Sequence, residues 1–161
     1  MIPYTISATT YRRLCIQGYG KFSRNELAAL HFGIRLSYAV CALISAAGLY
    51  LMNIPILSAV MFTAFLGVIL PNHPIDYVYN YGLRQLFSLP ELPPRTPQVK
   101  FACGIATVWL GITILFFWYG LFSLAIIWGS VLIIIAGLVS TTDICIPSMI
   151  YNRLTGQKLG K

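Results

Sequence analysis

Charged residues are scarce in this sequence, and acidic residues are the scarcest of all. Only 9% of the 161 residues are charged, and four Asp and Glu stand against eleven Lys and Arg. A soluble domain of this size needs far more charge to cover its surface. The scarcity therefore excludes an ordinary soluble protein, and the 58% apolar content indicates an integral membrane protein.

Several functional signatures are also missing. The sequence has no glycine-rich phosphate loop, no nucleophile elbow and no zinc-binding pattern. No Asp or Glu lies inside an apolar run, which argues against an ion-coupled transporter, because such proteins use ionisable groups at depth. The net charge of +7 forms no basic stripe with interleaved aromatics, so we expect no nucleic-acid partner. Residues 1–22 lack the apolar run of a cleaved signal peptide, so the first membrane helix is expected to direct insertion.

Four apolar runs are long enough, or nearly so, to cross a bilayer; they cover residues 36–52, 56–70, 101–119 and 121–139. We predict an all-α integral membrane protein, a four-helix bundle made of two transmembrane hairpins in a single domain over residues 1–161. Its parts are expected to be an N-terminal segment and helix lead-in (1–35), a first hairpin (36–70), a central loop (71–100), a second hairpin (101–140) and a tail (141–161).

Local signals predict where these helices begin and end. Ser23 and Glu26 have the spacing of a capping box at the start of the first helix. Pro55 suits the first turn of the second helix. Gly120 is expected to make the tight turn of the second hairpin. Arg35, near the start of the first apolar run, is expected to extend outwards to the lipid headgroups.

Basic residues are distributed on one side of this arrangement. All eleven lie in the N-terminal segment, the central loop or the tail, and the two hairpin turns carry none. Positively charged segments stay on the cytoplasmic side of a membrane. We therefore predict a multi-pass protein of the bacterial inner membrane with both termini and the central loop in the cytoplasm. The lipid bilayer is then its main surrounding, and no soluble extracytoplasmic partner is expected.

The central loop has two parts. Tyr77, Tyr81 and Arg84 have helical spacing, which predicts a short interfacial helix. The proline-rich stretch 89–97 is expected to be an extended tether. A Tyr-Asn pair follows a proline after each hairpin, at 79–80 and at 151–152, which suggests a parallel pseudo-repeat.

Three motifs carry a resemblance to a known family: PPRTPQVKFA (93–102), Pro74-x-x-Tyr77 and the closing CIPSMIY (145–151). Over residues 25–155 the chain resembles the small bacterial four-helix membrane proteins catalogued as domain of unknown function 4395. Members often close with Cys-x-x-Cys-x-x-Tyr, and here Ser148 stands in place of the second Cys. The resemblance implies the fold, whereas the departure puts inherited two-thiol chemistry in doubt.

Cysteine and histidine are the candidate reactive residues. Cys145, Cys103 and Cys41 are all expected near the cytoplasmic leaflet, where they would serve either as redox thiols or as small packing residues. His31 and His73 could hold a haem or a metal between helices, but they lack paired ligand spacing and are expected to be interfacial. The sequence requires no cofactor and predicts no metal site.

Polar pairs and small residues suggest packing contacts. Asp76 with Arg84, and Asp143 with Arg153, could form interfacial ion pairs. Small residues at close-packing spacings are expected to let helices approach one another; they are Ala42 with Ala46, Thr63 with Gly67, Gly104 with Gly111, and Gly129 with Ala136.

We expect a non-catalytic function from these features: a small accessory or structural subunit that packs against larger integral membrane proteins. Two alternatives stay open, a membrane thiol-redox or maturation protein that uses Cys145 with Cys41 or Cys103, and a carrier of a small or apolar substrate. Aromatic and basic residues form the candidate partner surface; they are Tyr77, Tyr81, Arg84, Phe87, Phe116, Phe117, Trp118 and Trp128.

Overall fold

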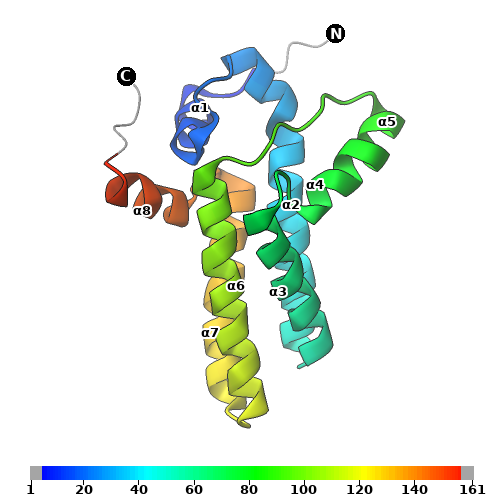
Figure 1. Cartoon of the computed structure of the whole chain (residues 1–161), viewed down its shortest axis with the longest axis vertical. Helices are drawn as coiled ribbons and strands as arrows, with labels where there is room; N and C mark the ends of the chain where they lie inside the picture. The colour runs from blue at the N-terminus through cyan, green and yellow to red at the C-terminus, as the bar shows by residue number, and fades with distance from the viewer. Residues whose placement is uncertain (1–4, 157–161) are drawn as a thin grey trace.

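The computed structural model describes residues 5–156, which fold into helices joined by short turns and one long loop (Figure 1). No strand occurs within this range, so the predicted all-α class is confirmed. The elements in chain order are α1 (Ala8–Leu14), η1 (Cys15–Tyr19), α2 (Arg24–Tyr50), α3 (Ile54–Ile69), α4 (Pro74–Val78), η2 (Tyr79–Leu83), α5 (Arg84–Phe87), α6 (Pro97–Trp118), α7 (Phe122–Thr142) and α8 (Ile146–Leu154).

Three helices, α2, α6 and α7, are each long and apolar enough to cross a membrane. The fourth, α3, has 16 residues, which is short of the roughly 20 that a span needs. It passes the same test when joined to residues 74–87, which follow it at a bend of 83°. The chain is thus a helical membrane protein with three spans, or four if the bent pair is one span.

Side-chain caps explain where the long helices begin. Ser23 and Glu26 form the predicted capping box, and the Ser23 backbone N–H donates to the Glu26 carboxylate at 2.7 Å. The Asn53 side chain caps α3, and Pro55 occupies its first turn as predicted. Thr96 caps α6 in the same way. Each cap satisfies backbone N–H groups that the first turn of a helix leaves without partners.

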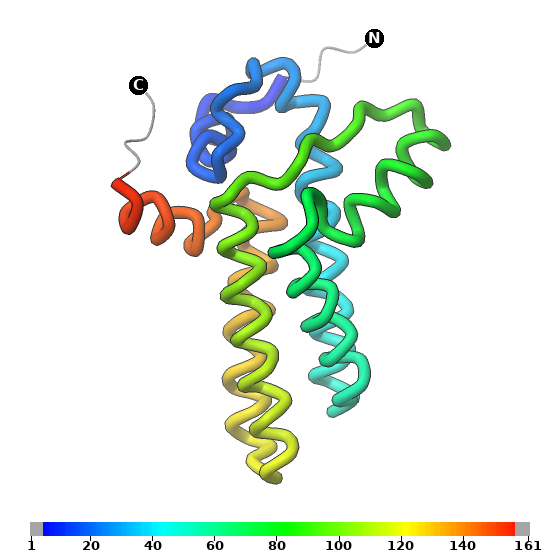
Figure 2. The backbone as a smooth tube through the Cα atoms, in the orientation of Figure 1, coloured from blue at the N-terminus to red at the C-terminus, as the bar shows by residue number. Residues whose placement is uncertain are grey.

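The four long helices run side by side, with α3 against α6 and α2 against α7 (Figure 2). The turns at 51–53 and 119–121 lie at the same end, which we call the turn end. Gly120 has φ +72°, which a glycine adopts without strain. The N-terminal helices, the central loop and α8 gather at the opposite end, which we call the loop end.

Short helices at the loop end project sideways from the long ones (Figure 2). In the central loop, α4, η2 and α5 form the expected short helical arm, where the Tyr77 and Tyr81 rings stack with centroids 6.3 Å apart. The N-terminal lead-in and the tail were expected to be polar segments, but α1 and α8 are helical. Exposed apolar side chains recur along α8 at helical spacing, at Ile146, Ile150 and Leu154, which is typical of a helix lying on a membrane surface.

Small residues act differently from one helix to the next. A Cβ on Gly67 would stand 2.6 Å from the His73 ring, so only glycine lets that ring approach α3. Gly129 makes a similar close contact with Leu49 of α2. Gly104 has no side-chain or backbone atom of a neighbour closer than 3.9 Å. The prediction of close packing is therefore wrong for Gly104, and Ala42 and Ala136 instead border a cavity described below.

The Gly67 contact gives a test with a matched control. Gly67→Ala should destabilise the protein by about 1–3 kcal/mol, because the added methyl group collides with a buried imidazole. Gly104→Ala, in the facing helix α6, should leave stability nearly unchanged. Thermal unfolding of both variants in detergent measures the difference, and equal melting temperatures would contradict the packing described here.

Candidate functional site

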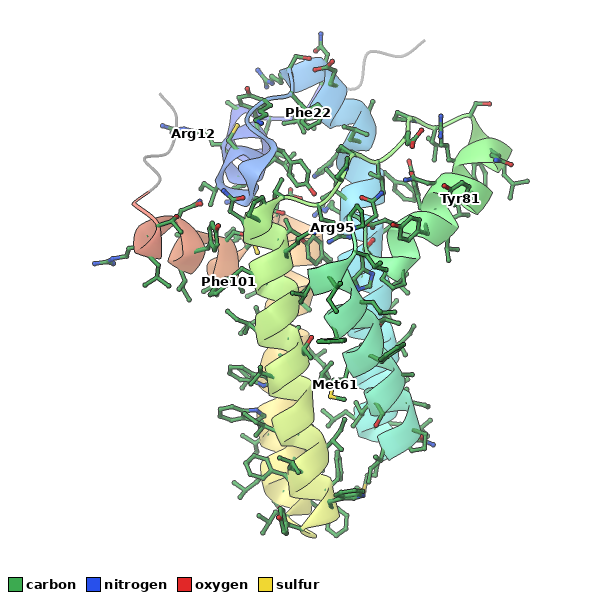
Figure 3. The ribbon with its side chains drawn as sticks, viewed as in Figure 1. Arg12, Phe22, Met61, Tyr81, Arg95 and Phe101 are labelled. Atoms are coloured by element: carbon green, nitrogen blue, oxygen red, sulfur yellow. The ribbon has the colours of Figure 1, made fainter. Side chains whose placement is uncertain are left out.

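A buried ion pair lies at the loop end, between the proline-rich stretch and α4 (Figure 3 labels Arg95). Arg95 donates to the Asp76 carboxylate from Nε at 2.5 Å and from Nη2 at 2.6 Å. The two residues are only 7% and 2% exposed. Ser37 of α2 donates to the same carboxylate, as does the His73 backbone N–H at 3.0 Å. One carboxylate thus joins α2, α4 and the segment that leads into α6.

The electrostatics of this pair favour its charged form. Burial by itself would raise the pKa of Asp76, but the hydrogen bonds and charge of Arg95 outweigh it and hold the pKa below its ordinary value. The Arg95 guanidinium also lies over the Tyr38 ring, with Cζ 5.4 Å from the ring centroid. The pair is consequently ionised and contributes no net charge to its surroundings.

The ion pairs suggested from sequence have other partners in the structure. Asp76 binds Arg95, whereas Arg84 makes an exposed pair with Glu91 at 2.7 Å. The prediction of an Asp76–Arg84 pair is therefore wrong. Its physical reason is the proline-rich stretch, which folds back over α4 and delivers a closer guanidinium. Asn80 holds this stretch in place by bonding the backbone of Leu92, accepting from its N–H at 2.9 Å.

The predicted Asp143–Arg153 pair is also absent from the contacts of Asp143. This carboxylate lies 2.9 Å from His31 Nε2 and 3.5 Å from Arg35 Nε. Asp143 has φ 61° and ends α7, which turns its side chain towards α2 rather than towards α8. Arg35 therefore faces a neighbouring helix and does not extend outwards as expected.

Cations also cover the last carbonyl groups of α7. Arg35 donates to the carbonyls of residues 140 and 141, and Arg13 donates to that of Thr142 at 2.6 Å. Gln17 donates to the Asp143 carbonyl at 2.9 Å. These contacts satisfy carbonyls that a helix end leaves open, and the positive charges complement its dipole. They fasten the N-terminal segment to the end of α7.

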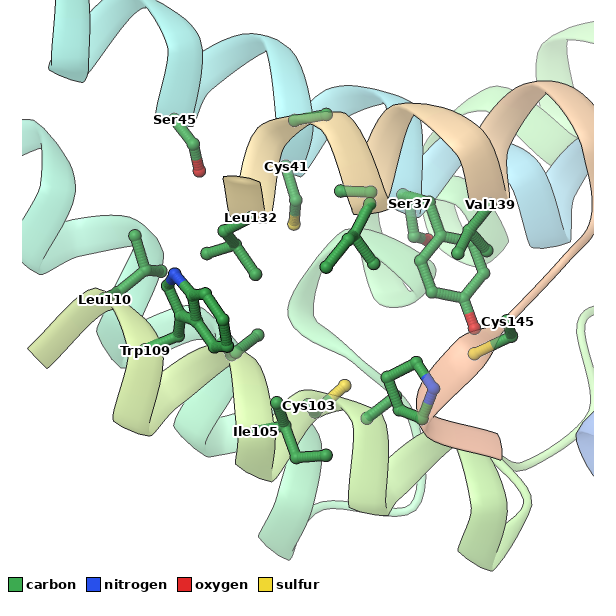
Figure 4. A pocket seen from close by; sticks show the side chains of 18 of the residues that line it. Ser37, Cys41, Ser45, Cys103, Ile105, Trp109, Leu110, Leu132, Val139 and Cys145 are labelled. Carbon is green, nitrogen blue, oxygen red and sulfur yellow. The ribbon is translucent and has the colours of Figure 1, made fainter. Parts of the chain in front are cut away.

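A cavity of about 260 Å³ lies among the long helices and extends from the loop end towards their middle. Cys41, Cys103 and Cys145 all border it, and Figure 4 shows their side chains around the same space. The three candidate thiols come from α2, from α6 and from the residue before α8, and the fold brings them together. Most of the other bordering residues are apolar or small; they include Ala42, Val60, Ala64, Ala102, Ala106, Trp109, Leu110, Leu132, Ile133, Ala136, Val139 and Ile150.

His73 lies beside two of these thiols and is buried, at 3% exposed, rather than interfacial as predicted. Its Nε2 is 4.0 Å from Cys41 Sγ, and both its ring and Cys103 Sγ lie within 3.2 Å of the point where a Cβ on Gly67 would stand. Nδ1 accepts from the Ile75 N–H at 3.3 Å, so the neutral ring carries its proton on Nε2. Burial, aided by the nearby guanidinium, lowers the pKa of His73 to about 4, which keeps the ring neutral at pH 7.

Cys145 is the thiol closest to the closing family-like motif. Ser148 Oγ donates to its Sγ at 3.0 Å, so the residue that replaces the second Cys of that motif is a direct neighbour. Burial raises the pKa of Cys145, which keeps it a neutral thiol at pH 7. Cys15 does not border the cavity, and within residues 5–156 no group of three His, Cys, Asp or Glu side chains could hold a metal ion.

Sequence reasoning missed two residues of this site, Arg95 and Tyr38. The proline-rich stretch that contains Arg95 was interpreted as a tether, although a lone basic residue between prolines could have suggested an anchored one. The Tyr38 side chain borders the cavity, and its hydroxyl is buried without a hydrogen-bond partner in the described part of the chain. No local pattern identifies such a hydroxyl, because its isolation depends on helices distant in sequence.

The candidate partner residues do not form one surface. Tyr81 and Phe87 are exposed at the loop end, on the arm that Figure 3 marks with Tyr81. Trp118 is exposed at the turn end. Phe117 is buried in the core and so cannot belong to an exposed surface. The remaining members lie between these cases: Tyr77, Arg84 and Phe116 are half-buried, and Trp128 stacks on Trp109 with ring centroids 4.3 Å apart.

Comparison with known proteins gives one match. A family model described as Domain of unknown function (DUF4395) matches residues 31–155. No curated protein and no solved structure matches the chain. The matched segment contains the ion pair, His73 and the three thiols of the cavity.

Removal of one partner of the buried ion pair should be costly. Asp76→Asn should destabilise the protein by about 3–5 kcal/mol, because it leaves the Arg95 guanidinium buried without a counter-charge. Glu91→Gln removes the exposed partner of Arg84 and should cost at most about 1 kcal/mol. Thermal unfolding in detergent measures both, and similar losses in the two variants would show that the buried pair has no special role.

Proposed function

The chain belongs to the DUF4395 family, and from that premise we propose that the protein binds a small, uncharged, largely apolar molecule inside the membrane, as a carrier or receptor for it. The observation that supports this proposal is the cavity of about 260 Å³ among the long helices. An apolar cavity of roughly 150 Å³ is enough to hold benzene. The space here therefore suits a molecule built on one substituted ring.

The charge of the site favours an uncharged ligand. Arg95 is the basic residue at the cavity, and Asp76 neutralises it through two hydrogen bonds. His73 is neutral at pH 7 because its pKa is lowered to about 4. A charged ligand would gain no counter-charge there and would lose its hydration.

Thiol-redox chemistry is the second candidate, favoured by the three thiols around one cavity. Against it, the pKa of Cys145 is raised, and a thiol is a far weaker nucleophile than a thiolate. A loss of two hydrogens in the intact mass after mild oxidation, abolished by Cys145→Ser, would favour this candidate over the first.

The accessory-subunit role stays a prediction. Its support is the apolar outer surface of the long helices, with exposed side chains such as Leu43, Phe62, Val108 and Ile127. Lipid covers such a surface as well as a partner helix does. Purification in mild detergent followed by mass spectrometry tests it, and recovery of the chain alone would count against it.

We further propose that the four long helices form a bundle with an internal pseudo-two-fold axis along the membrane normal. Exchange of the two hairpins converts the α3–α6 contact into the α7–α2 contact. After the first hairpin, Asn80 bonds the segment that leads into the second, at Leu92. After the second, Asn152 bonds the segment that leads into the first, donating to the Ile16 carbonyl at 2.7 Å. The reciprocal contacts support the repeat that the two Tyr-Asn pairs suggested.

The orientation belongs to the same proposal: the loop end faces the cytoplasm of a bacterium and the turn end faces outwards. All Lys and Arg residues lie in segments that the structure or the chain order assigns to the loop end, and neither turn carries one. This distribution follows the positive-inside rule.

Filling the cavity should abolish ligand binding without unfolding the protein. We expect 1,2,4,5-tetramethylbenzene to raise the melting temperature of the wild-type protein in detergent, because it binds only the folded state. Ala42→Leu places three more carbons at the cavity wall and should remove most of this shift. Ala47→Leu, on the exposed face of the same helix, should retain it. A shift that is absent in the wild type, or equal in all three proteins, would refute the binding proposal.

Cysteine labelling in spheroplasts tests the orientation. In a Cys15→Ser background, Tyr119→Cys at the turn end should react with a membrane-impermeant maleimide added outside. Gln85→Cys on α5 should react only after the membrane is permeabilised. Both positions are exposed, so the difference reports sidedness rather than burial. The opposite pattern would reverse the proposed orientation.

A further inference from the structure

We propose that the molecule held in the cavity is a quinone-type ring, an uncharged six-membered ring that bears carbonyl oxygens. This inference rests on the proposed ligand-binding function and names the chemical class of the ligand. It starts from the polar groups that border the cavity at its loop end.

The polar groups at that end offer hydrogens rather than lone pairs. The Tyr38 hydroxyl is buried and has no hydrogen-bond partner among residues 5–156. His73 presents Nε2–H, because its Nδ1 is occupied by the Ile75 N–H. The thiols of Cys41 and Cys103 add weak donors. A buried donor without a partner costs free energy, so a ligand with acceptor oxygens gains by pairing with it.

The carboxylate that could compete for these donors is already occupied. Asp76 accepts from Arg95, Ser37 and the His73 backbone N–H. Within the described chain the Tyr38 hydroxyl therefore has to find its acceptor in the cavity. A carbonyl oxygen supplies one without bringing a charge that nothing at the site would balance.

The walls fit a flat ring. The Trp109 indole borders the cavity and is fixed in place by stacking on Trp128 and by donating from Nε1 to the Trp128 carbonyl at 2.8 Å (Figure 4 labels Trp109). Aromatic faces pack favourably against other rings in offset or edge-on arrangements. Small side chains, Ala102, Ala106 and Ala136, leave the remaining space open.

Two ring compounds of nearly the same shape test the inference: tetramethyl-1,4-benzoquinone and 1,2,4,5-tetramethylbenzene, which lacks the carbonyls. The quinone has no free ring position, so thiols cannot displace a ring hydrogen by addition there. Titration calorimetry of the wild-type protein in detergent, with a micelle blank, should show the quinone binding roughly three- to tenfold more tightly than the hydrocarbon. Tyr38→Phe should remove most of this difference by weakening quinone binding alone, because the aromatic ring under Arg95 is kept.

The outcomes separate the two proposals. If the hydrocarbon binds and the quinone binds no better, the quinone inference is overturned and the binding function stands. If Tyr38→Phe leaves quinone affinity unchanged, the assignment of Tyr38 is overturned as well. If neither compound binds the wild-type protein, both proposals fail. The comparison in the wild type needs no variant, so it holds even if Tyr38→Phe folds poorly.

Discussion

A single buried carboxylate organises the loop end of this membrane protein. Asp76 receives hydrogen bonds from α2, from the start of its own helix α4 and from Arg95 in the proline-rich stretch. A buried charge is tolerated only when its partners satisfy it almost completely, so these three segments have to meet in one arrangement. The long helices, which have no hydrophobic drive to associate in lipid, thereby gain a specific polar joint at one end.

That joint also shapes the cavity below it. Because Arg95 and Asp76 cancel, the loop end of the cavity is polar but carries no net charge. His73 caps α4 through its Nδ1 and thus presents Nε2–H towards Cys41. Small residues on α6 and α7 keep the space open where larger ones would fill it. The result is an apolar chamber with hydrogen-bond donors at one end, which is the property from which the proposed ligand follows.

A second polar joint holds the other half of the molecule. The end of α7 is covered by Arg13, Gln17, His31 and Arg35, which come from the N-terminal segment and α2. Each hairpin is thus tied at the loop end to the segment that precedes the other hairpin. At the turn end, by contrast, only short turns connect the helices. The specific polar contacts are concentrated where water is available to one side and lipid to the other.

The sequence by itself determined the helices and their class. Apolar runs and caps such as Ser23 with Glu26, and Pro55 at the start of α3, act over a few residues, so their outcome is readable locally. The family was also recognisable from short motifs. Only the tertiary structure decided that Asp76 pairs with Arg95 rather than Arg84, that His73 is buried, and that three distant thiols border one cavity. Such contacts depend on how the hairpins pack against each other, and no single segment encodes the distance between side chains that only packing brings together.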